Sequence, residues 1–315
     1  MKRGTWILLV LACAVGLRAA DEGDAGQPAA FLKLGVGGRE LAMGRIAAPD
    51  RGDAFAFSYN PAYLAALDTQ VLGSQTSFLA GDRSLDHFSY ARPFELFDQS
   101  LAGGLTYTHF GLNAPIEVRV GNTPEPDSTF TASQSALQLS LATWQFGSFG
   151  FGLNARWLDQ QLGQGLQGYG YAFDLGSLWR ISRKVELGLV LQDLIGSMRW
   201  SSSRVEPLAP ALRSTLTLKP RRDLVVCAEL EKNLEQDPRF RGGVEWWLPG
   251  AFMALRAGMN HDAWSLGAGF RAEPWGWSSA LDWSLSRDPL EPGALAQRLS
   301  LSVELPTAED KKDPS

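Results

Sequence analysis

Alternation of apolar and polar residues with a period of two dominates the chain from Val71 to Leu305. Leu137, Leu139 and Leu141, for example, alternate with polar or small residues, and 185–192 and 298–305 repeat the pattern. This period is typical of β-strands with one apolar face. The alternation and its turn residues predict fourteen strands, near 71–79, 85–93, 99–109, 132–145, 149–160, 168–181, 184–193, 210–219, 223–230, 239–248, 251–259, 263–272, 276–287 and 297–305.

The lengths of these strands and of their connections favour a membrane barrel. Most strands have 8–12 residues, near the roughly 9–11 that cross a bilayer when tilted. Connections after even-numbered strands are short, whereas those after odd-numbered strands are mostly longer, with 80–84 and 260–262 as exceptions. Outer-membrane barrels combine short periplasmic turns with long outer loops. We therefore expect an all-β, transmembrane antiparallel β-barrel of about 14 strands, with 110–131 and 194–209 outside the cell and both termini in the periplasm.

Charged side chains fall on the strand face opposite the long apolar runs. A charge on the lipid-facing side is destabilising near the middle of the bilayer by roughly 2–4 kcal/mol for Arg or Lys, so these side chains are expected in the lumen. Buried charges are normally paired, and ion pairs that brace the wall are favoured over acid–base chemistry. The predicted lumen-facing charges are Arg156, Asp174, Glu186, Arg213, Glu229, Arg256, Arg271, Asp282 and Glu304.

Tryptophans at or near the strand ends also suggest the aromatic girdles of a membrane barrel. The alternative is a secreted β-sandwich with core aromatics, because aromatic residues are common in strands generally. The tryptophans concerned are Trp157, Trp179, Trp246, Trp247, Trp264, Trp275 and Trp277.

The period-two pattern is absent from the stretch Phe31–Leu67. It has glycines at 35, 37, 38 and 44, a short broken helix near 34–43 and one further helical turn near 63–67. Irregular backbone at membrane depth is tolerated only inside protein or in a wet cavity. We therefore expect residues 21–70 to form a plug, or hatch, in the lumen of a barrel built by 71–305, with a charged tail at 306–315.

The N-terminus has the composition of a secretory signal peptide. A twelve-residue apolar run, Trp6–Leu17, follows Met1-Lys2-Arg3, and a basic region followed by a short apolar one is typical of cleaved signals. We assign 1–20 as the signal, although no cleavage site fits well and Cys13 leaves a lipoprotein signal as an alternative. The chain of 315 residues is 45% hydrophobic, with a mean hydropathy of −0.11 and no apolar stretch long enough for a spanning helix.

Charge and cysteine content exclude some function classes. Cleavage of 1–20 would remove three basic residues and change the net charge from −5 to −8, which does not indicate a nucleic-acid partner. Cys227 would then be the only cysteine, so no internal disulfide is expected.

No enzyme signature is apparent. His87, His109 and His261 are isolated, without a second ligand at metal spacing. The glycines at 35, 37 and 38 do not follow a predicted strand, as a phosphate-binding loop requires. We expect no catalytic residues, no metal and no cofactor.

The irregular stretch contains, in this order, the short motifs Ala30-Phe31-Leu32, Leu34-Gly35, Gly38-Arg39, Leu41-Ala42-Met43-Gly44, Asp53-Ala54 and Asn60-Pro61-Ala62. In this order, just before the first strand, they resemble the N-terminal signature of the PorV/PorQ family, which is related to FadL-type outer-membrane fatty-acid channels. Glu40 and Arg45 depart from that signature, because both place a charge where relatives have a small residue. The resemblance implies that the segment is a hatch, with Arg39, Met43, Gly44, Asp53, Asn60, Pro61 and Ala62 as its motif residues.

Two functions of different classes follow from the resemblance. One is a plugged channel for hydrophobic small molecules such as fatty acids, which we favour. The other is a PorV-like component of type IX protein secretion, with secreted proteins as partners; a purely structural outer-membrane protein is a third possibility. Each implies the outer membrane of a Gram-negative-type bacterium and contact with its lipid.

Overall fold

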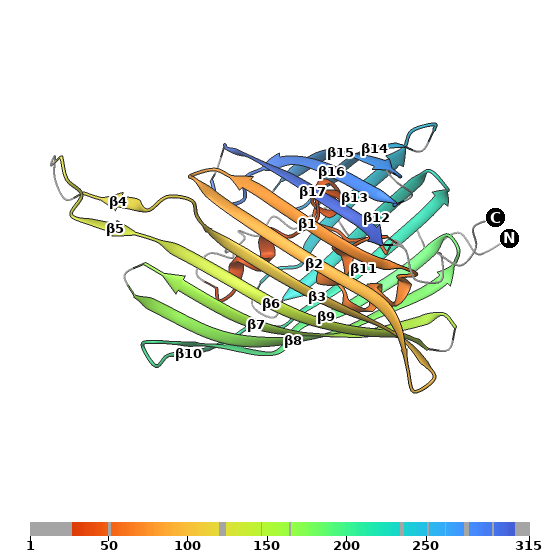
Figure 1. Ribbon diagram of the computed structural model, residues 1–315, viewed down its shortest axis with the longest axis horizontal. Helices are drawn as coiled ribbons and strands as arrows, with labels where there is room; N and C mark the ends of the chain where they lie inside the picture. Colours follow the sequence, from red (N-terminus) through yellow and green to blue (C-terminus); the bar gives the residue numbers. More distant parts are fainter. Residues whose placement is uncertain are drawn as a thin grey trace.

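The computed structural model describes residues 27–49, 52–119, 124–145, 147–163, 165–233, 236–250, 252–261, 263–273, 277–291 and 293–305. The predicted signal peptide 1–20, the tail 306–315 and Trp275 lie outside these residues. Within the described part of the chain, fourteen strands form one antiparallel barrel (Figure 1). They are β1 (Gln70–Leu79), β2 (Arg83–Leu96), β3 (Gln99–Leu112), β6 (Ala132–Gln145), β7 (Phe149–Leu162), β8 (Leu166–Ser182), β9 (Val185–Trp200), β11 (Ala211–Arg221), β12 (Leu224–Asn233), β13 (Arg239–Trp247), β14 (Met253–Met259), β15 (Trp264–Ala272), β16 (Ser279–Arg287) and β17 (Leu295–Leu305).

The sheet closes on itself between its first and last strands. β1 pairs with β2 on one side and with β17 on the other, so that Val71 lies between Ala91 and Glu304. The remaining neighbours pair in chain order, including β8 with β9 and β9 with β11. Closure removes the unpaired edges that an open sheet would expose. The prediction of an all-β antiparallel barrel of about 14 strands is confirmed.

Two of the predicted long connections contain strand structure instead. Residues 110–131 were expected to be a loop, but β3 continues to Leu112 and a two-stranded ribbon of β4 (Ile116–Val118) and β5 (Ser128–Phe130) follows. Residues 194–209 were also expected to be a loop, but β9 continues to Trp200 and pairs with β10 (Val205–Pro207). We call the end of the barrel that carries β4, β5 and β10 the hairpin end, and the opposite end, with its short connections, the turn end (Figure 1).

The interruption at Asp193 explains why β9 was predicted too short. Asp193 has φ of 52° and lies in a bulge where the β8–β9 register shifts. Leu194 and Ile195 are consequently both exposed, at 45% and 60%. A bulge breaks the alternation from which strands are predicted.

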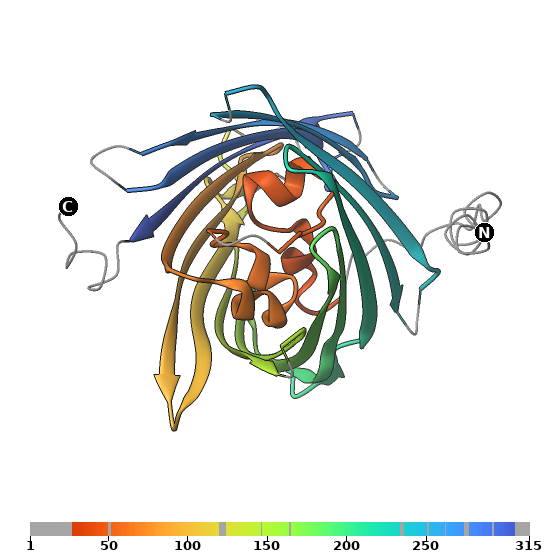
Figure 2. The ribbon, with the colours of Figure 1, turned by 90° about the vertical axis from the view of Figure 1, so that its right-hand side faces the viewer.

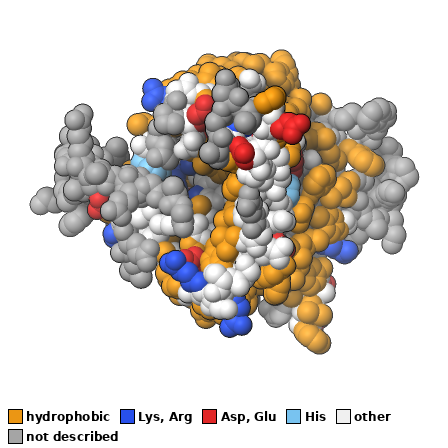
Figure 3. Space-filling model, turned by 90° about the vertical axis from the view of Figure 1, so that its left-hand side faces the viewer, with side chains coloured by type: hydrophobic (Ala, Val, Ile, Leu, Met, Phe, Trp, Pro, Cys, Tyr) orange, Lys and Arg blue, Asp and Glu red, His pale blue; other side chains and the backbone are white. Residues whose placement is uncertain are grey.

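The two faces of the wall differ as predicted. On β6, Leu139 is 60% exposed whereas its neighbour Gln138 is 4% exposed, and the other strands alternate in the same way. Figure 3, which views the hairpin end, shows hydrophobic side chains along the outside of the barrel and charged ones around its mouth. Five of the girdle tryptophans lie at or near strand ends, but Trp157 lies in the middle of β7, so that part of the prediction was wrong. No helix in the described residues is long and apolar enough to span a bilayer.

Candidate functional site: the barrel lumen

Residues 27–49 and 52–67, here called the lumenal segment, lie inside the ring of strands (Figure 2). Its short elements are η2 (Ala30–Leu34), α2 (Gly38–Ala42), η3 (Ala56–Ser58) and η4 (Pro61–Ala66). α2 packs against β14, β15, β16 and β17, whereas η4 packs against β3, β6, β7 and β8. The segment therefore contacts opposite parts of the wall.

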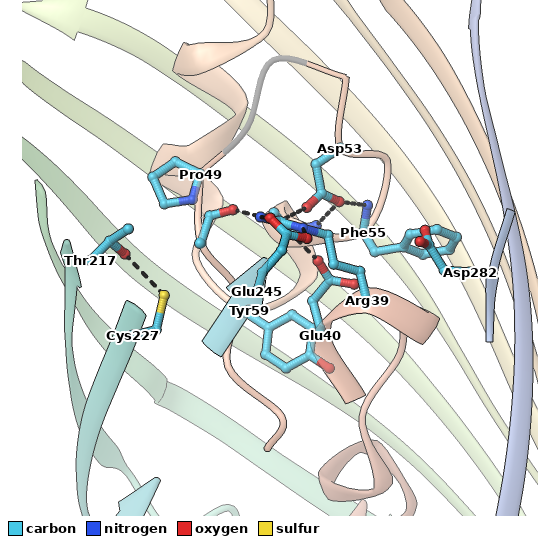
Figure 4. A network of polar contacts seen from close by, with 12 residues as sticks. Arg39, Glu40, Pro49, Asp53, Phe55, Tyr59, Thr217, Cys227, Glu245 and Asp282 are labelled. Carbon is cyan, nitrogen blue, oxygen red and sulfur yellow. Dashed lines mark hydrogen bonds and ion pairs between the residues drawn. The ribbon is translucent and has the colours of Figure 1, made fainter. Parts of the chain in front are cut away.

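Arg39 of α2 ties the segment to β13 (Figure 4). Its Nε and Nη2 donate to the two carboxylate oxygens of Glu245, at 2.9 and 3.0 Å. Its Nη1 donates to the Ala48 carbonyl and to Asp53 Oδ2, both at 3.1 Å. A two-point contact between guanidinium and carboxylate is among the strongest side-chain hydrogen bonds. The geometry fixes both the height and the rotation of α2 in the barrel.

The partners of Arg39 make further hydrogen bonds, Glu245 to the barrel wall and Asp53 to the start of η3. Glu245 also accepts from Arg256 Nε at 2.7 Å, and Arg256 Nη1 donates to Asp282 at 2.6 Å. On the other side, Asp53 Oδ1 accepts from the backbone N–H groups of Phe55 and Ala56, at 2.8 and 3.0 Å, where η3 begins. Asp53 thus joins the arginine to the start of η3, and we call Arg39, Asp53, Glu245, Arg256 and Asp282 the Arg39 network.

Glu40 is adjacent to this network but is not satisfied by it. It is fully buried, and neither of its carboxylate oxygens has a hydrogen-bond partner among the described residues. Arg39 Nη1 lies 3.7 Å from its Oε1. Burial, together with the nearby charge of Asp53, raises the pKa of the Glu40 carboxyl well above its usual range.

Met43 and Gly44 follow α2 and contact the backbone of β13 and β14 directly. A Cβ added at Gly243 would meet the Met43 carbonyl oxygen, and one added at Gly258 would meet the Gly44 nitrogen, at 2.4 and 2.2 Å. Gly44 itself has φ of 80°, which favours glycine. The Met-Gly motif is therefore matched by glycines in the wall at the point where the two backbones touch.

Asn60 and Pro61 make the equivalent contact with the opposite wall. Asn60 Nδ2 donates to the carbonyls of Ser177 and Leu189, at 3.1 and 3.3 Å, and its Oδ1 accepts from Ala62 N at 3.0 Å. The Asn60 side chain thus caps η4 and bridges β8 and β9. Its backbone is extended, as expected before proline, and Pro61 occupies the first helical position, where no N–H donor is needed.

Two further ion-pair clusters lie nearer the hairpin end. In the first, Arg156 Nη2 donates to Asp174 at 2.5 Å and to Asp193 at 2.7 Å, and Asp193 N donates to Asp174 Oδ1 at 2.8 Å. These contacts hold the bulge in β9. From the sequence, Asp193 was placed at the end of a predicted strand, without a role in the lumen.

In the second cluster, Glu229 accepts from two arginines. Arg213 donates to it from Nε and Nη2 at 3.1 and 2.7 Å, and Arg241 donates both to Glu229 and, at 2.5 Å, to Glu231. The Arg213 guanidinium also lies over the Tyr59 ring, 5.5 Å from its centroid. This cation–π contact links the cluster to the lumenal segment.

A cavity of about 80 Å³ lies between these clusters and the lumenal segment, toward the hairpin end. A smaller one of about 20 Å³ lies beside Glu40 and Asp53. The larger cavity is lined by polar side chains together with Leu32, Val36 and three alanines, Ala136, Ala209 and Ala211. The lumen is thus packed toward the turn end and hollow toward the hairpin end.

The predicted lumen-facing charges all lie on the inward parity of their strands. Glu304 is half-buried and accepts from Ser278 Oγ at 3.1 Å. Arg271 is exposed at the turn end, with its guanidinium 4.4 Å from the centroid of the Trp247 ring. The remaining seven are 3–7% exposed: Arg156, Asp174, Glu186, Arg213, Glu229, Arg256 and Asp282.

Sequence reasoning missed four charged residues of these clusters, namely Asp193, Glu231, Arg241 and Glu245. Glu231 was placed in a loop because β12 was ended at 230. Arg241 and Glu245 share the inward parity of β13, opposite Val244 and Trp246, and could have been found from the alternation alone. That Glu245 pairs with Arg39 required the closed barrel.

The described residues contain no cluster of three or more His, Cys, Asp or Glu that could hold a metal ion. His87 is 1% exposed, and its Nδ1 lies 2.8 Å from Thr108 Oγ1. His109 contacts Ser135 Oγ at 3.0 Å.

No protein-family model matches the sequence, and no curated protein matches it. Solved structures match the fold. The toluene transporter TbuX of Ralstonia pickettii superposes with a TM-score of 0.58 and 14% identity, and the toluene transporter TodX of Pseudomonas putida with 0.57 and 12%; each alignment covers 85% of this chain and 97% of the other. A FadL homologue of Pseudomonas aeruginosa superposes with a TM-score of 0.51 and 13% identity, over 91% and 99% of the two chains. At these identities the similarity shows that this chain has the fold of FadL-type transporters.

Proposed function

We propose that this chain is a plugged channel for hydrophobic small molecules in the outer membrane of a Gram-negative-type bacterium. The observation that carries the proposal is the lumenal segment, which is fixed across the lumen by Arg39 on one wall and Asn60 on the other. Irregular backbone held inside a barrel in this way closes the direct path through it. The fold similarity to proteins named as toluene transporters and as a FadL homologue supports the choice of substrate class.

The outside of the barrel supports the membrane location. Leu139, Leu153 and Ile195 are 56–60% exposed on strands whose opposite faces are polar, and an apolar outer band with a polar interior is the arrangement of outer-membrane barrels. The hairpin end then faces the outside of the cell and the turn end the periplasm, because the longer connections lie at the hairpin end. Cysteines introduced at Ser202 and at Arg183 test this: an impermeant thiol reagent on intact cells should label the first and not the second.

Removal of the anchoring part of the segment tests the plug. A variant that lacks residues 31–53 should insert as a barrel and conduct ions in a planar bilayer at least about tenfold better than the intact chain. Asn60→Ala, a milder change, should leave the barrel heat-modifiable on a gel and raise conductance less. A folded deletion variant that conducts no better than the intact protein would exclude the segment as a plug.

Uptake tests the substrate class. Cells that express the intact chain should take up radiolabelled toluene or a labelled long-chain fatty acid faster than cells without it. If cells with and without the chain took up each compound at the same rate, the barrel would not transport these compounds.

A PorV-like role in protein secretion is the second candidate. The β4–β5 ribbon projects beyond the barrel (Figure 1) and exposes Val118 and Phe130, at 42% and 37%. An exported protein could bind such an apolar strand pair. A photo-crosslinker at Phe130 that captures one defined exported protein, and loses it when Val118 on the paired strand is replaced by Asp, would favour this role over the channel.

A further inference from the structure

Two neighbouring turns at the turn end carry a group of basic side chains. Residues 183–184 connect β8 to β9, and residues 222–223 connect β11 to β12. β9 pairs with β11, and Lys219 N donates to the Lys184 carbonyl at 2.8 Å, so the two turns lie side by side. No lysine or arginine occurs in the other connections at this end, 97–98, 146–148, 248–252 and 273–278.

Three of the basic side chains on these turns are exposed and unpaired. Arg183, Lys184 and Arg222 have no ion pair among the described residues. Arg221, the last residue of β11, differs because its Nε donates to Asp223 Oδ1 at 3.0 Å and its Nη2 to the other carboxylate oxygen. Asp223 is the only acid in the two turns. Three positive charges at this edge of the barrel are therefore left without a counter-charge.

The acid on β9 beneath the turns does not supply that counter-charge. Glu186 is 4% exposed. It accepts from Arg180 Nε at 3.0 Å, and its other carboxylate oxygen lies 2.8 Å from Lys219 Nζ. Two cations thus already face this single carboxylate, and the exposed basic side chains gain nothing from it.

The outer face of the same part of the wall is apolar up to the turns. Trp179 and Ile181 on β8 are 41% and 48% exposed, and Trp246 on β13 is 42% exposed. Trp246 pairs with Leu224, the first residue of β12, and its Nε1 donates to Asp223 at 3.3 Å. Tryptophans at the strand ends of a membrane barrel mark the boundary between hydrocarbon and head groups. The basic turns therefore begin where the lipid-facing surface ends, at the depth of lipid phosphates.

We propose that the turns 183–184 and 222–223 bind the head group of an anionic phospholipid in the leaflet at the turn end. Arg183, Lys184 and Arg222 contact its phosphate, and its acyl chains lie along the apolar outer face beside Trp179 and Ile181. A lipid suits this surface better than a soluble anion, because salt screens exposed charges from a soluble anion whereas the bilayer holds a lipid beside them. The site requires a barrel in a membrane, but it depends neither on transport nor on which end faces the periplasm.

Removal of the three charges gives the first test. The variant Arg183→Gln, Lys184→Gln and Arg222→Gln leaves the ion pair of Arg221 in place. A matched control removes three exposed arginines elsewhere on the barrel. It combines Arg92→Gln, Arg199→Gln and Arg287→Gln.

Addition of charge gives a second test with the opposite sign. Asp223→Asn releases Arg221 and adds one net positive charge to the two turns. Its control, Asp98→Asn, removes an exposed acid from the connection between β2 and β3, also at the turn end. A gain in affinity cannot arise from misfolding, so this pair keeps the proposal testable even if the triple variant fails to fold.

Binding is measured by native mass spectrometry of the full chain in detergent micelles, with dioleoyl phosphatidylglycerol and dioleoyl phosphatidylcholine as lipid probes. Glycerol 3-phosphate and a hexaglutamate peptide are the soluble probes. We expect the first phosphatidylglycerol to bind at least about tenfold more tightly than phosphatidylcholine, and less tightly as salt is raised. The triple variant should lose about tenfold or more in affinity for phosphatidylglycerol and its control less than about threefold. Asp223→Asn should gain about threefold and Asp98→Asn less than about 1.5-fold. Heat-modifiability on a gel shows which variants are folded.

Several results would overturn the proposal. Equal affinity of the intact chain for the two lipids would mean that the turns do not select an anionic head group. Equal losses in the folded triple variant and its control would mean that only total charge matters, and an affinity of Asp223→Asn no higher than that of Asp98→Asn would exclude the two turns. Tighter binding of glycerol 3-phosphate or of the hexaglutamate peptide than of phosphatidylglycerol would assign a soluble phosphate or an acidic protein instead. None of these outcomes alters the conductance and uptake results that test the channel itself.

Discussion

The two halves of the lumen hold similar side chains in different ways. Toward the turn end, the Arg39 network and the backbone contacts of Met43 and Gly44 fill the space between the segment and the wall, leaving a cavity of about 20 Å³. Toward the hairpin end, the arginines around Arg156 and Arg213 surround a cavity of about 80 Å³. Buried ion pairs stabilise a structure only when their geometry is complete. The first half therefore holds the segment in place, whereas the second leaves open space between the segment and the wall.

The largest expected contrast is between an arginine from each half. Arg39→Met would leave Glu245 with Arg256 alone and Asp53 without its ion pair, so we expect the free energy of unfolding to fall by about 3–5 kcal/mol. Arg241→Met should cost about 1–3 kcal/mol, because Glu229 and Glu231 keep Arg213, at 2.7 and 3.7 Å, and Glu231 borders a cavity that water can enter.

Urea unfolding in lipid vesicles measures both values, with the exposed Glu95→Gln as a control. If Arg241→Met proved as destabilising as Arg39→Met, the two halves would not differ in the way proposed.

Two neighbouring glycines of β13, Gly242 and Gly243, test the backbone contact between Met43 and the wall. Gly243→Ala would place a Cβ 2.4 Å from the Met43 carbonyl oxygen, whereas at Gly242 the nearest atom is Met259 Cγ, 4.0 Å away. We expect the first change to destabilise the barrel by about 1–3 kcal/mol, since the atom it meets is backbone, and the second by less than about 1 kcal/mol.

Protease sensitivity of the lumenal segment gives an independent measurement, because only Gly243→Ala should displace the segment. Equal sensitivity in the two variants would count against direct backbone contact at Met43.

The positions of the strands were predictable because apolar residues on the lipid-facing side alternate with polar residues on the lumen-facing side. Lipid and lumen require opposite side chains at alternate positions, so the period-two pattern of β6 fixes its orientation without knowledge of its neighbours. The bulge at Asp193 was not predictable in this way, because it is held by Arg156 and Asp174 on other strands.

The candidate site was predictable only in part, because its residues contact partners on strands that are distant in the sequence. The motif residues Arg39, Asp53 and Asn60 could be selected from the sequence, but their partners could not. Arg39 and Glu245 are 206 positions apart, and their pairing depends on how far each strand is shifted in a closed barrel. The cavity also left no local signal, since it is bounded by strands from across the chain and by the segment itself.

Substitutions at two alanines of β6 test whether the turn-end half of the lumen is packed more tightly than the hairpin-end half. Ala142 and Ala136 share the inner face of β6, but Ala142 lies in the part of the strand near η4 whereas Ala136 lines the larger cavity. Ala142→Leu should overfill its surroundings and lower the unfolding free energy by about 1–3 kcal/mol. Ala136→Leu has empty space to occupy, and we expect a change within about 1 kcal/mol in the same vesicle assay. The opposite order of effects would mean that the hollow half lies at the other end.

The smallest effect concerns Glu40, the one acid in the packed half that the network leaves without a hydrogen bond. Because burial and Asp53 raise its pKa in the folded protein, folding takes up a proton at any pH between the unfolded-state value of about 4.3 and the raised one. Its contribution to stability is then lost as pH rises above that unfolded-state value. Glu40→Gln keeps the shape of the neutral acid and removes the proton uptake. We expect the variant to be more stable than the intact protein at pH 7 and equal to it near pH 3, where the acid is protonated in both states.

The control for this last comparison is Glu95→Gln, whose side chain is exposed at the turn end. A Glu40→Gln variant less stable than the intact chain at pH 7 would mean that the carboxylate is ionised and paired in the folded barrel. The Arg39 network would then have to accommodate one more negative charge. Asp53, Glu245 and Asp282 already outnumber Arg39 and Arg256, so that charge would need another cation. Arg271, exposed beside the smaller cavity at the turn end, is the group placed to supply it.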